Sequence, residues 1–340
     1  MPSLLERVAG ALFGGDSGGP DQQLIDEATE AIVETVEPRL RALSGYRRKL
    51  AGSVSQTIAH LRALGREPLE PIPFGRSVWS QDPRVNAFFA SADEVPACIG
   101  RSEEVRRFFE QHSECSEAYA LLGMKREERK VLAPRLEGDS LKQDVARVSV
   151  SFSGHRLIAP GADAAQTRLE VGRRIIERLA QLALARVASL GEKAAGLEQH
   201  KAFLAARLRM LKLGRGGIEG LVSDPEKTAS QIRALERELK ETSEGYAEAK
   251  STLFNPDGCI DQINAVLARP GEQVALTHVL LRLNRMGIEV EAGSSEPAAD
   301  LDLTELSLGD GLRATIALVR IPRGELPPVE DKLAEAEKYL

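Results

Sequence analysis

The sequence predicts an α+β protein that is mainly helical, with a long antiparallel coiled-coil hairpin inserted between a β-hairpin and a C-terminal antiparallel β-sheet. Three observations lead to this class. Apolar residues recur at every seventh position through the middle of the chain, polar and apolar residues alternate on both sides of that stretch, and the N-terminal region has helical periodicity. With 340 residues, 42% of them hydrophobic, the chain can bury a sizeable core.

The first 13 residues predict a short amphipathic helix. Its apolar side chains lie three or four positions apart, and the ones on the expected face are Leu4, Leu5, Val8 and Leu12. Residues 14–20 are rich in glycine and predict a flexible linker. We interpret the helix as a candidate for docking on a membrane surface, on a partner or on its own chain.

The linker contains GGDSGGP, in which Ser17 has the surroundings of a serine nucleophile. A trypsin-like protease needs its histidine and aspartate earlier in the chain, but all five histidines follow Ser17. A hydrolase elbow follows a buried strand, whereas this stretch follows a helix-like segment and no alternation of strands and helices comes after it. The pattern therefore indicates a tether and not a catalyst.

Residues 21–135 predict a helical region, broken at Pro38, with an aromatic and proline-rich segment at 68–96. Six of the chain's fourteen aromatic residues fall between positions 74 and 109, which indicates a local core. Helices are expected from Ser102 to His112 and from Ser116 to Leu132. Residues 143–160 then alternate apolar and polar side chains and predict a β-hairpin that turns at Ser153–Gly154.

Residues 162–253 predict the coiled-coil hairpin, with a glycine-rich connection at 213–220. Its seam is the expected partner-binding or self-association site. The seam residues are Leu169, Ile176, Leu190, Leu197, Leu204, Leu211, Ile232, Leu239 and Tyr246. Because the first helix is the longer one, part of it must pack elsewhere or bend near Gly191 or Gly196.

Residues 255–322 predict a short helix and then an antiparallel sheet. One hairpin is expected over 279–290, with its turn at Met286–Gly287, and a second over 301–318. We expect the hairpin at 143–160 to join this sheet in one base domain, from which the coiled coil would project. Residues 323–340 predict a charged tail.

An enzyme or a small-ligand site is the alternative for the segment 68–116. Its candidate pocket residues are Arg76, Trp79, Asp82, Arg84, His112 and Cys115. The sequence contains none of the usual metal-binding or nucleotide-binding patterns, so we expect no metal, no cofactor and no catalytic residue. Three cysteines with long gaps favour a reducing compartment.

The distribution of charged residues limits the classes of partner that the chain is expected to bind. The chain has a net charge of −6, but residues 168–215 carry eleven Lys and Arg side chains against four Glu. This basic excess is explained by helix faces that are exposed to water or that face helices of opposite charge. The alternative is that the basic residues bind anionic lipid. The scarcity of aromatic residues argues against nucleic acid. The sequence thus predicts a non-catalytic cytoplasmic scaffold that binds a protein partner or itself, with a peripheral role at the inner face of the membrane as the alternative.

Overall fold

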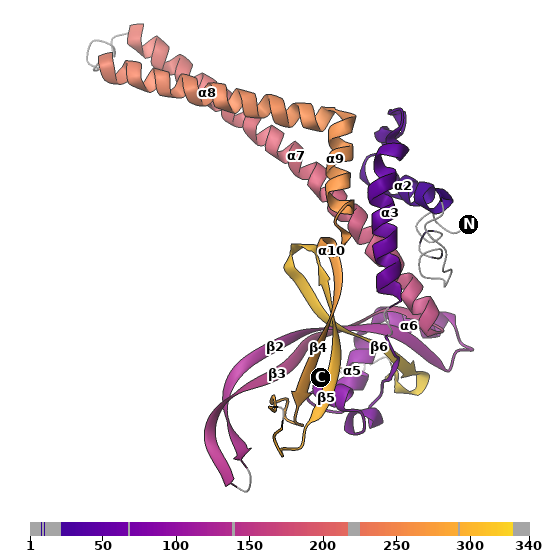
Figure 1. The fold of residues 1–340 in the computed structure, drawn as a ribbon. Helices are drawn as coiled ribbons and strands as arrows, with labels where there is room; N and C mark the ends of the chain where they lie inside the picture. Colours follow the sequence, from indigo (N-terminus) through magenta and orange to yellow (C-terminus); the bar gives the residue numbers. More distant parts are fainter. Residues whose placement is uncertain are drawn as a thin grey trace, which may run out of the picture. The chain divides into compact units, whose positions relative to one another are not determined.

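The structure is a computed structural model that describes residues 8, 10, 22–66, 69–137, 140–216, 225–291 and 293–328. It is an α+β fold, in which a β-hairpin precedes the long helical region and an antiparallel sheet follows it, as the sequence predicts (Figure 1). The chain divides into two compact units. Unit 1 takes residues 58–176 and 270–340 together with the N-terminal segment, and unit 2 takes residues 20–57 and 177–269.

Unit 1 is built on a six-stranded sheet of order β3-β2-β6-β5-β4, with the short β1 paired to β6. Its strands are β1 (Ile72–Pro73), β2 (Glu117–Glu137), β3 (Ser140–Gly161), β4 (Val274–Leu283), β5 (Ala299–Leu308) and β6 (Leu312–Pro322). Its short helices are η2 (Ser77–Ser80), α4 (Pro83–Phe88), α5 (Glu94–Arg101), α6 (Glu103–Gln111), α10 (Pro270–Gln273), η4 (Gly309–Gly311) and η5 (Arg323–Glu325).

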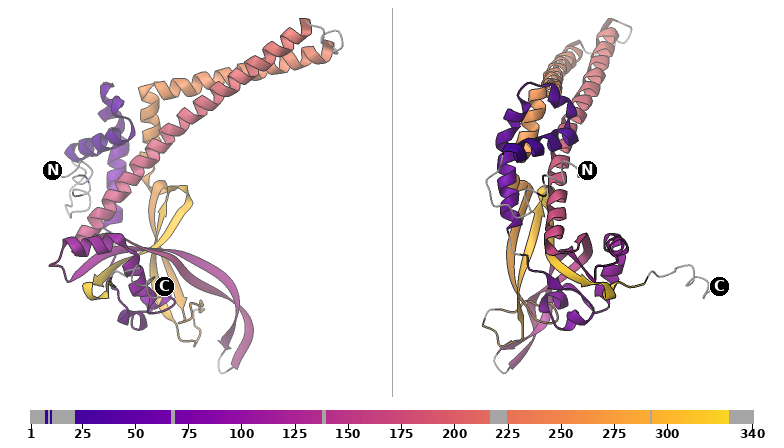
Figure 2. Two further views of the ribbon diagram at one scale, coloured as in Figure 1. Left: turned by 180° about the vertical axis from the view of Figure 1, so that it is seen from behind. Right: turned by 90° about the vertical axis from the view of Figure 1, so that its right-hand side faces the viewer.

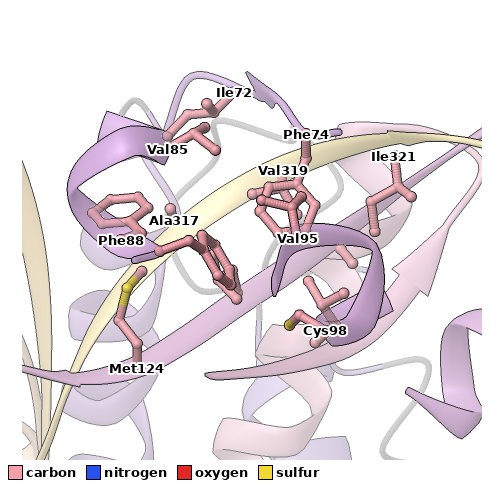
Figure 3. Packing of buried hydrophobic residues seen from close by; sticks show 14 of the residues in the cluster. Ile72, Phe74, Val85, Phe88, Val95, Cys98, Met124, Ala317, Val319 and Ile321 are labelled. Atoms are coloured by element: carbon pink, nitrogen blue, oxygen red, sulfur yellow. The ribbon is translucent and has the colours of Figure 1, made fainter. Parts of the chain in front are cut away.

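The core of unit 1 lies between this sheet and the helices α4, α5 and α6 (Figure 3). Alternate residues of β2 and β6 point into it, among them Met124 and Val319. The aromatic segment supplies Phe74, Phe88 and Phe89, all at most 2% exposed. The clustering of aromatic residues in the sequence therefore marks the place where short helices cover one face of a sheet.

Two contacts bridge the edges of the sheet. The backbone of Val150 on β3 donates to the carbonyl of Gly287 at 2.7 Å, and that of Val290 donates to the carbonyl of Arg282 on β4 at 2.8 Å. The segment 287–290 thus lies between the two edge strands. The turn expected at Met286–Gly287 is present, and Glu289 bridges back to Leu283 at the end of β4. The expected second strand is reduced to isolated bridges, and the full strand partner of β4 is β5.

The expected helix from Ser116 to Leu132 is also wrong, because this segment is most of strand β2. Its many Glu, Lys, Arg, Leu and Ala residues favour a helix locally. However, Ala118, Ala120 and Leu122 lie at alternate positions and are all fully buried. Pairing with β6 on one side and β3 on the other satisfies the backbone along the strand and overrides the local preference.

The predicted turn at Ser153–Gly154 is wrong for a related reason. Strand β3 continues through both residues, and its partner is β2. Gly154 has a φ of 65°, and the register shifts between Gly123 and Lys125 opposite it, so glycine marks a β-bulge here and not a turn. A hairpin does precede the long helical region, but it consists of β2 and β3, and the whole of the predicted hairpin at 143–160 lies within β3. Its connection falls between the described ends of β2 and β3.

Unit 2 is helical. Its elements are α2 (Gln22–Val36), η1 (Pro38–Ala42), the first part of α3 (Tyr46–Gly65), α7 (Ala164–Gly216) from Glu177 onward, α8 (Pro225–Phe254) and α9 (Pro256–Leu267). Glu30 of α2 pairs with Arg41 at 3.1 Å and with Arg47 at 2.8 Å, so ion pairs link α2 to the segment that follows it. Thr57 donates to the carbonyl of Leu267 at 2.8 Å and ties α3 to α9.

Candidate functional site

The helical hairpin of α7 and α8 has a regular buried seam. From Ala180 to Leu211, buried or half-buried positions on α7 recur in alternating steps of three and four residues. The same alternation runs from Ile232 to Ala249 on α8. This spacing is that of a two-helix coiled coil. We letter the seven positions of each repeat a to g, with a and d in the seam. Leu204 is then at position d and Ile232 at position a.

Side chains across the seam show that the helices are antiparallel. His200 lies 3.2 Å from Glu238, and Lys212 pairs with Glu236 at 2.7 Å. The Nζ atom of Lys201, at a seam position, lies 5.4 Å from the ring centroid of Tyr246. In both views of Figure 2, α8 runs back alongside the distal part of α7. A lysine at a seam position costs stability and favours one register over others.

The seam leaves little surface for a partner. Ile176, Leu204 and Ile232 are buried, and the other predicted seam residues are half-buried, namely Leu169, Leu190, Leu197, Leu211, Leu239 and Tyr246. Before the paired region, α7 packs on α9, where Arg186 donates to Gln262 at 2.9 Å. The helix is continuous through Gly191 and Gly196. The part of α7 that extends beyond α8 therefore contacts α9 of the same unit.

The outer face of the distal part of α7, unlike the seam, has large apolar side chains that are exposed. Phe203, Met210 and Leu213 are 59%, 74% and 70% exposed. With the numbering above, Phe203 and Met210 occupy c positions, and Ala206 and Leu213 occupy f positions, which face away from α8. We call these four residues the outer strip. Arg207 and Arg209 occupy the neighbouring g and b positions, so one arginine lies on each side of the strip.

The sequence analysis missed the outer strip, although a signal was present. Phe203 and Met210 are seven residues apart, as are Ala206 and Leu213, so a second apolar repeat accompanies the seam. A surface groove of about 430 Å³ adjoins the strip, lined by Arg207, Met210, Leu211, Gln231, Ala234, Leu235 and Glu238. An exposed apolar patch beside such a groove is a common feature of interaction sites.

The predicted pocket residues do not share one site. Trp79 and Asp82 line a cavity of about 420 Å³ together with Asn86, Asn284 and Arg285. The guanidinium of Arg84 forms an ion pair with the carboxylate of Asp82 at 3.0 Å. Burial tends to raise the pKa of Asp82, but the hydrogen bonds and charge of Arg84 outweigh it and hold that pKa below its usual value.

The remaining members lie elsewhere in unit 1. Arg76 pairs with Asp93 at 2.6 Å. His112 lines a different groove, and its ring centroid lies 4.5 Å from that of Phe108, on which it stacks. The backbone N–H of Cys115 donates to the carbonyl of His112 at 3.1 Å, in the turn that follows α6. Arg323 donates to the carbonyls of both His112 and Cys115. These contacts stabilise the turn after α6, which contains both His112 and Cys115.

Cys98 and Val8 both lie in buried positions. Burial raises the pKa of the Cys98 thiol to about 11, far from a nucleophilic thiolate at neutral pH. In the part of the chain that the structure describes, no cluster of three His, Cys, Asp or Glu side chains is placed to bind a metal ion. Val8 is 1% exposed, which leaves it no surface for docking, while Leu4, Leu5 and Leu12 lie outside the described residues.

Taken over the described residues, every helix is too short or too polar to cross a membrane. The fold and the site define an α+β protein with an antiparallel coiled-coil hairpin that carries an exposed apolar strip between arginines. The chain matches no protein-family model, and neither the curated proteins nor the solved structures include a match to it.

Proposed function

We propose that this protein is a non-catalytic scaffold or adaptor that binds another macromolecule through the outer strip of its helical hairpin. The exposure of Phe203, Met210 and Leu213 carries the proposal. Three large apolar side chains within eleven residues of one helix face are costly to leave in water, and they are a common signature of a docking surface. The seam predicted as the docking site instead has the role of holding the hairpin together.

The setting of the strip supports a binding function and not catalysis. Its own side chains are apolar and its flanking residues are Arg207 and Arg209, so no carboxylate, histidine or thiol belongs to the strip, although His200 and Glu238 lie beside it. A general acid, a general base or a nucleophile would need such a group. Because all three cysteines are free and Cys98 and Cys259 are buried, we place this activity in a reducing compartment, the cytoplasm.

The test compares a strip variant with a matched variant on the same helix. Phe203→Ser, Met210→Ser and Leu213→Ser together should leave the helix content unchanged, because these side chains contribute little to the seam. In a density gradient of host lysate, the wild-type chain should sediment with a larger assembly, and the strip variant should sediment as the free chain.

The control variant is Glu192→Ser with Gln199→Ser, which changes two f positions of the same outer face before the strip begins. It should sediment like the wild type. If the strip variant stays in the same assembly as the wild type, or if the wild type is already free, the proposed function is wrong.

A further inference from the structure

We infer that the outer strip binds the surface of a membrane containing anionic lipid, with the distal part of α7 lying on the bilayer. This inference rests on the proposed function, since it names the partner of the same surface. It differs from the membrane role predicted for residues 1–13, because the residues involved belong to the helical hairpin.

The arrangement of side chains on α7 is that of an interfacial helix. Phe203, Met210 and Leu213 form the apolar face, and Arg207 and Arg209 flank it on either side. Arginine side chains in this position can extend along the apolar surface and place their charges among lipid phosphates. Neither Arg207 nor Arg209 forms an ion pair with any of the residues that the structure describes.

The outer face changes character partway along α7. Earlier c and f positions hold Ser189, Glu192, Gly196 and Gln199, the ordinary residues of a solvated face. The same positions further on hold Phe203, Ala206, Met210 and Leu213. A helix face that only met water would have no reason to change in this way, so the change marks where a contact begins.

Charge distinguishes the two helices at this level of the hairpin. From residue 199 to 216, α7 carries five basic side chains and no acidic one. Over its whole length helix α8 carries six acidic and five basic side chains, and its outer face is polar apart from Ala234 and Ala247. The hairpin is therefore strongly basic on one side only. An anionic surface attracts this side, and it orients the hairpin with α7 toward the lipid.

The same charges argue against a second copy of this chain as the occupant. Two strips placed face to face would bring Arg207 and Arg209 of one copy against those of the other. Like charges at a buried contact oppose association. An acidic protein helix remains an alternative occupant, and the experiment below separates it from lipid.

The experiment uses co-sedimentation of the full chain with vesicles. One set contains phosphatidylcholine alone, and the other contains equal parts of phosphatidylcholine and phosphatidylglycerol. We expect binding to the anionic vesicles only, falling as salt is raised because salt screens the arginines. Arg207→Glu with Arg209→Glu should weaken binding by roughly tenfold or more, since each basic residue near such a surface contributes about fivefold.

Two variants serve as controls. Arg233→Glu with Arg237→Glu makes the same change of charge on the outer face of α8, at the same level of the hairpin, and should bind within about twofold of the wild type. Arg207→Lys with Arg209→Lys should retain binding. If the Glu variant loses helix content, the salt dependence of the wild type and the Lys variant decide the matter.

The outcomes separate the inference from the proposed function. Equal binding to neutral and anionic vesicles, or equal loss in the α7 and α8 variants, overturns the lipid assignment. If purified protein binds no vesicles but the strip variant still leaves the assembly in host lysate, the strip binds a protein, and the proposed function stands without the inference. If neither assay responds to the strip, both are wrong.

Discussion

The two compact units bury their apolar residues in different ways. Unit 1 packs a sheet against short helices around an aromatic core, with contacts between residues far apart in the sequence. Unit 2 packs long helices along narrow seams, in which the buried and half-buried residues of α7 and α8 are three or four positions apart. The comparison teaches that truncating one side chain should cost more stability in a broad core than in a seam, because two helices can move together to close the gap. A seam also leaves the outer faces of its helices free for other contacts.

The largest effect is expected in the aromatic core. Phe89 is 2% exposed, and its ring lies 5.5 Å from that of Phe74 and 4.2 Å from that of His155. Phe89→Ala should lower the free energy of unfolding by about 3–5 kcal/mol, because it leaves a cavity that the rigid sheet cannot close. Trp79, the single tryptophan, lies in unit 1, so its fluorescence during urea unfolding measures this loss.

The same kind of truncation in the seam should cost less. Leu204 is 2% exposed, and Leu204→Ala should lower the free energy of unfolding by about 2 kcal/mol, near the lower end for leucine, because the two helices can move together. Ellipticity at 222 nm should report the shift, while the transition seen by Trp79 should change little. A larger loss than that of Phe89→Ala would contradict the comparison.

A smaller effect is expected at the segment that bridges the edge strands. Gly287 has a φ of 71°, and a Cβ atom there would lie 2.6 Å from the carbonyl oxygen of Val150. Gly287→Ala should lower the free energy of unfolding by about 1–3 kcal/mol. Gly311 has a similar φ of 76° with no atom within 4 Å, so Gly311→Ala is the matched control for backbone strain alone. Equal losses would show that the contact with Val150 is unimportant.

The smallest effect is a dependence on pH. Burial lowers the pKa of His155 from its ordinary value, although its hydrogen bond to the carbonyl of Phe88 at 2.7 Å opposes the shift. Below the ordinary value near 6.5 the unfolded chain takes up a proton more readily than the folded chain, so stability should fall as the pH drops through this range.

The measurement is the midpoint of urea unfolding between pH 7 and pH 5, followed by Trp79 fluorescence. The slope should shrink in His155→Gln, which cannot take up a proton. A slope that is the same in both proteins would assign the pH dependence to other groups.

Periodicity in the sequence correctly predicts the α+β class, the helical hairpin and several helix starts. At the start of α7, the backbone of Gln166 donates to the side chain of Asp163 at 2.8 Å, as expected for a cap. These features depend on interactions within a few residues, or on a repeat that one helix displays along its whole length. The strand β2 has neither property, and its composition favours the wrong element.

The candidate site likewise depends partly on a local sequence pattern and partly on tertiary packing. The seven-residue repeat is visible in the sequence, and from Leu197 to Leu211 it marks buried or half-buried positions of α7 in the paired region, whereas Leu169 and Ile176 belong to unit 1. The second repeat on α7 is also visible in the sequence, but how far each of its side chains stays exposed depends on the packing of the two helices. For that reason the tertiary structure, and not the sequence, moves the candidate site from the leucine seam to Phe203, Met210 and Leu213. Burial is a property of neighbours brought together by folding, and a local pattern records only one side of each contact.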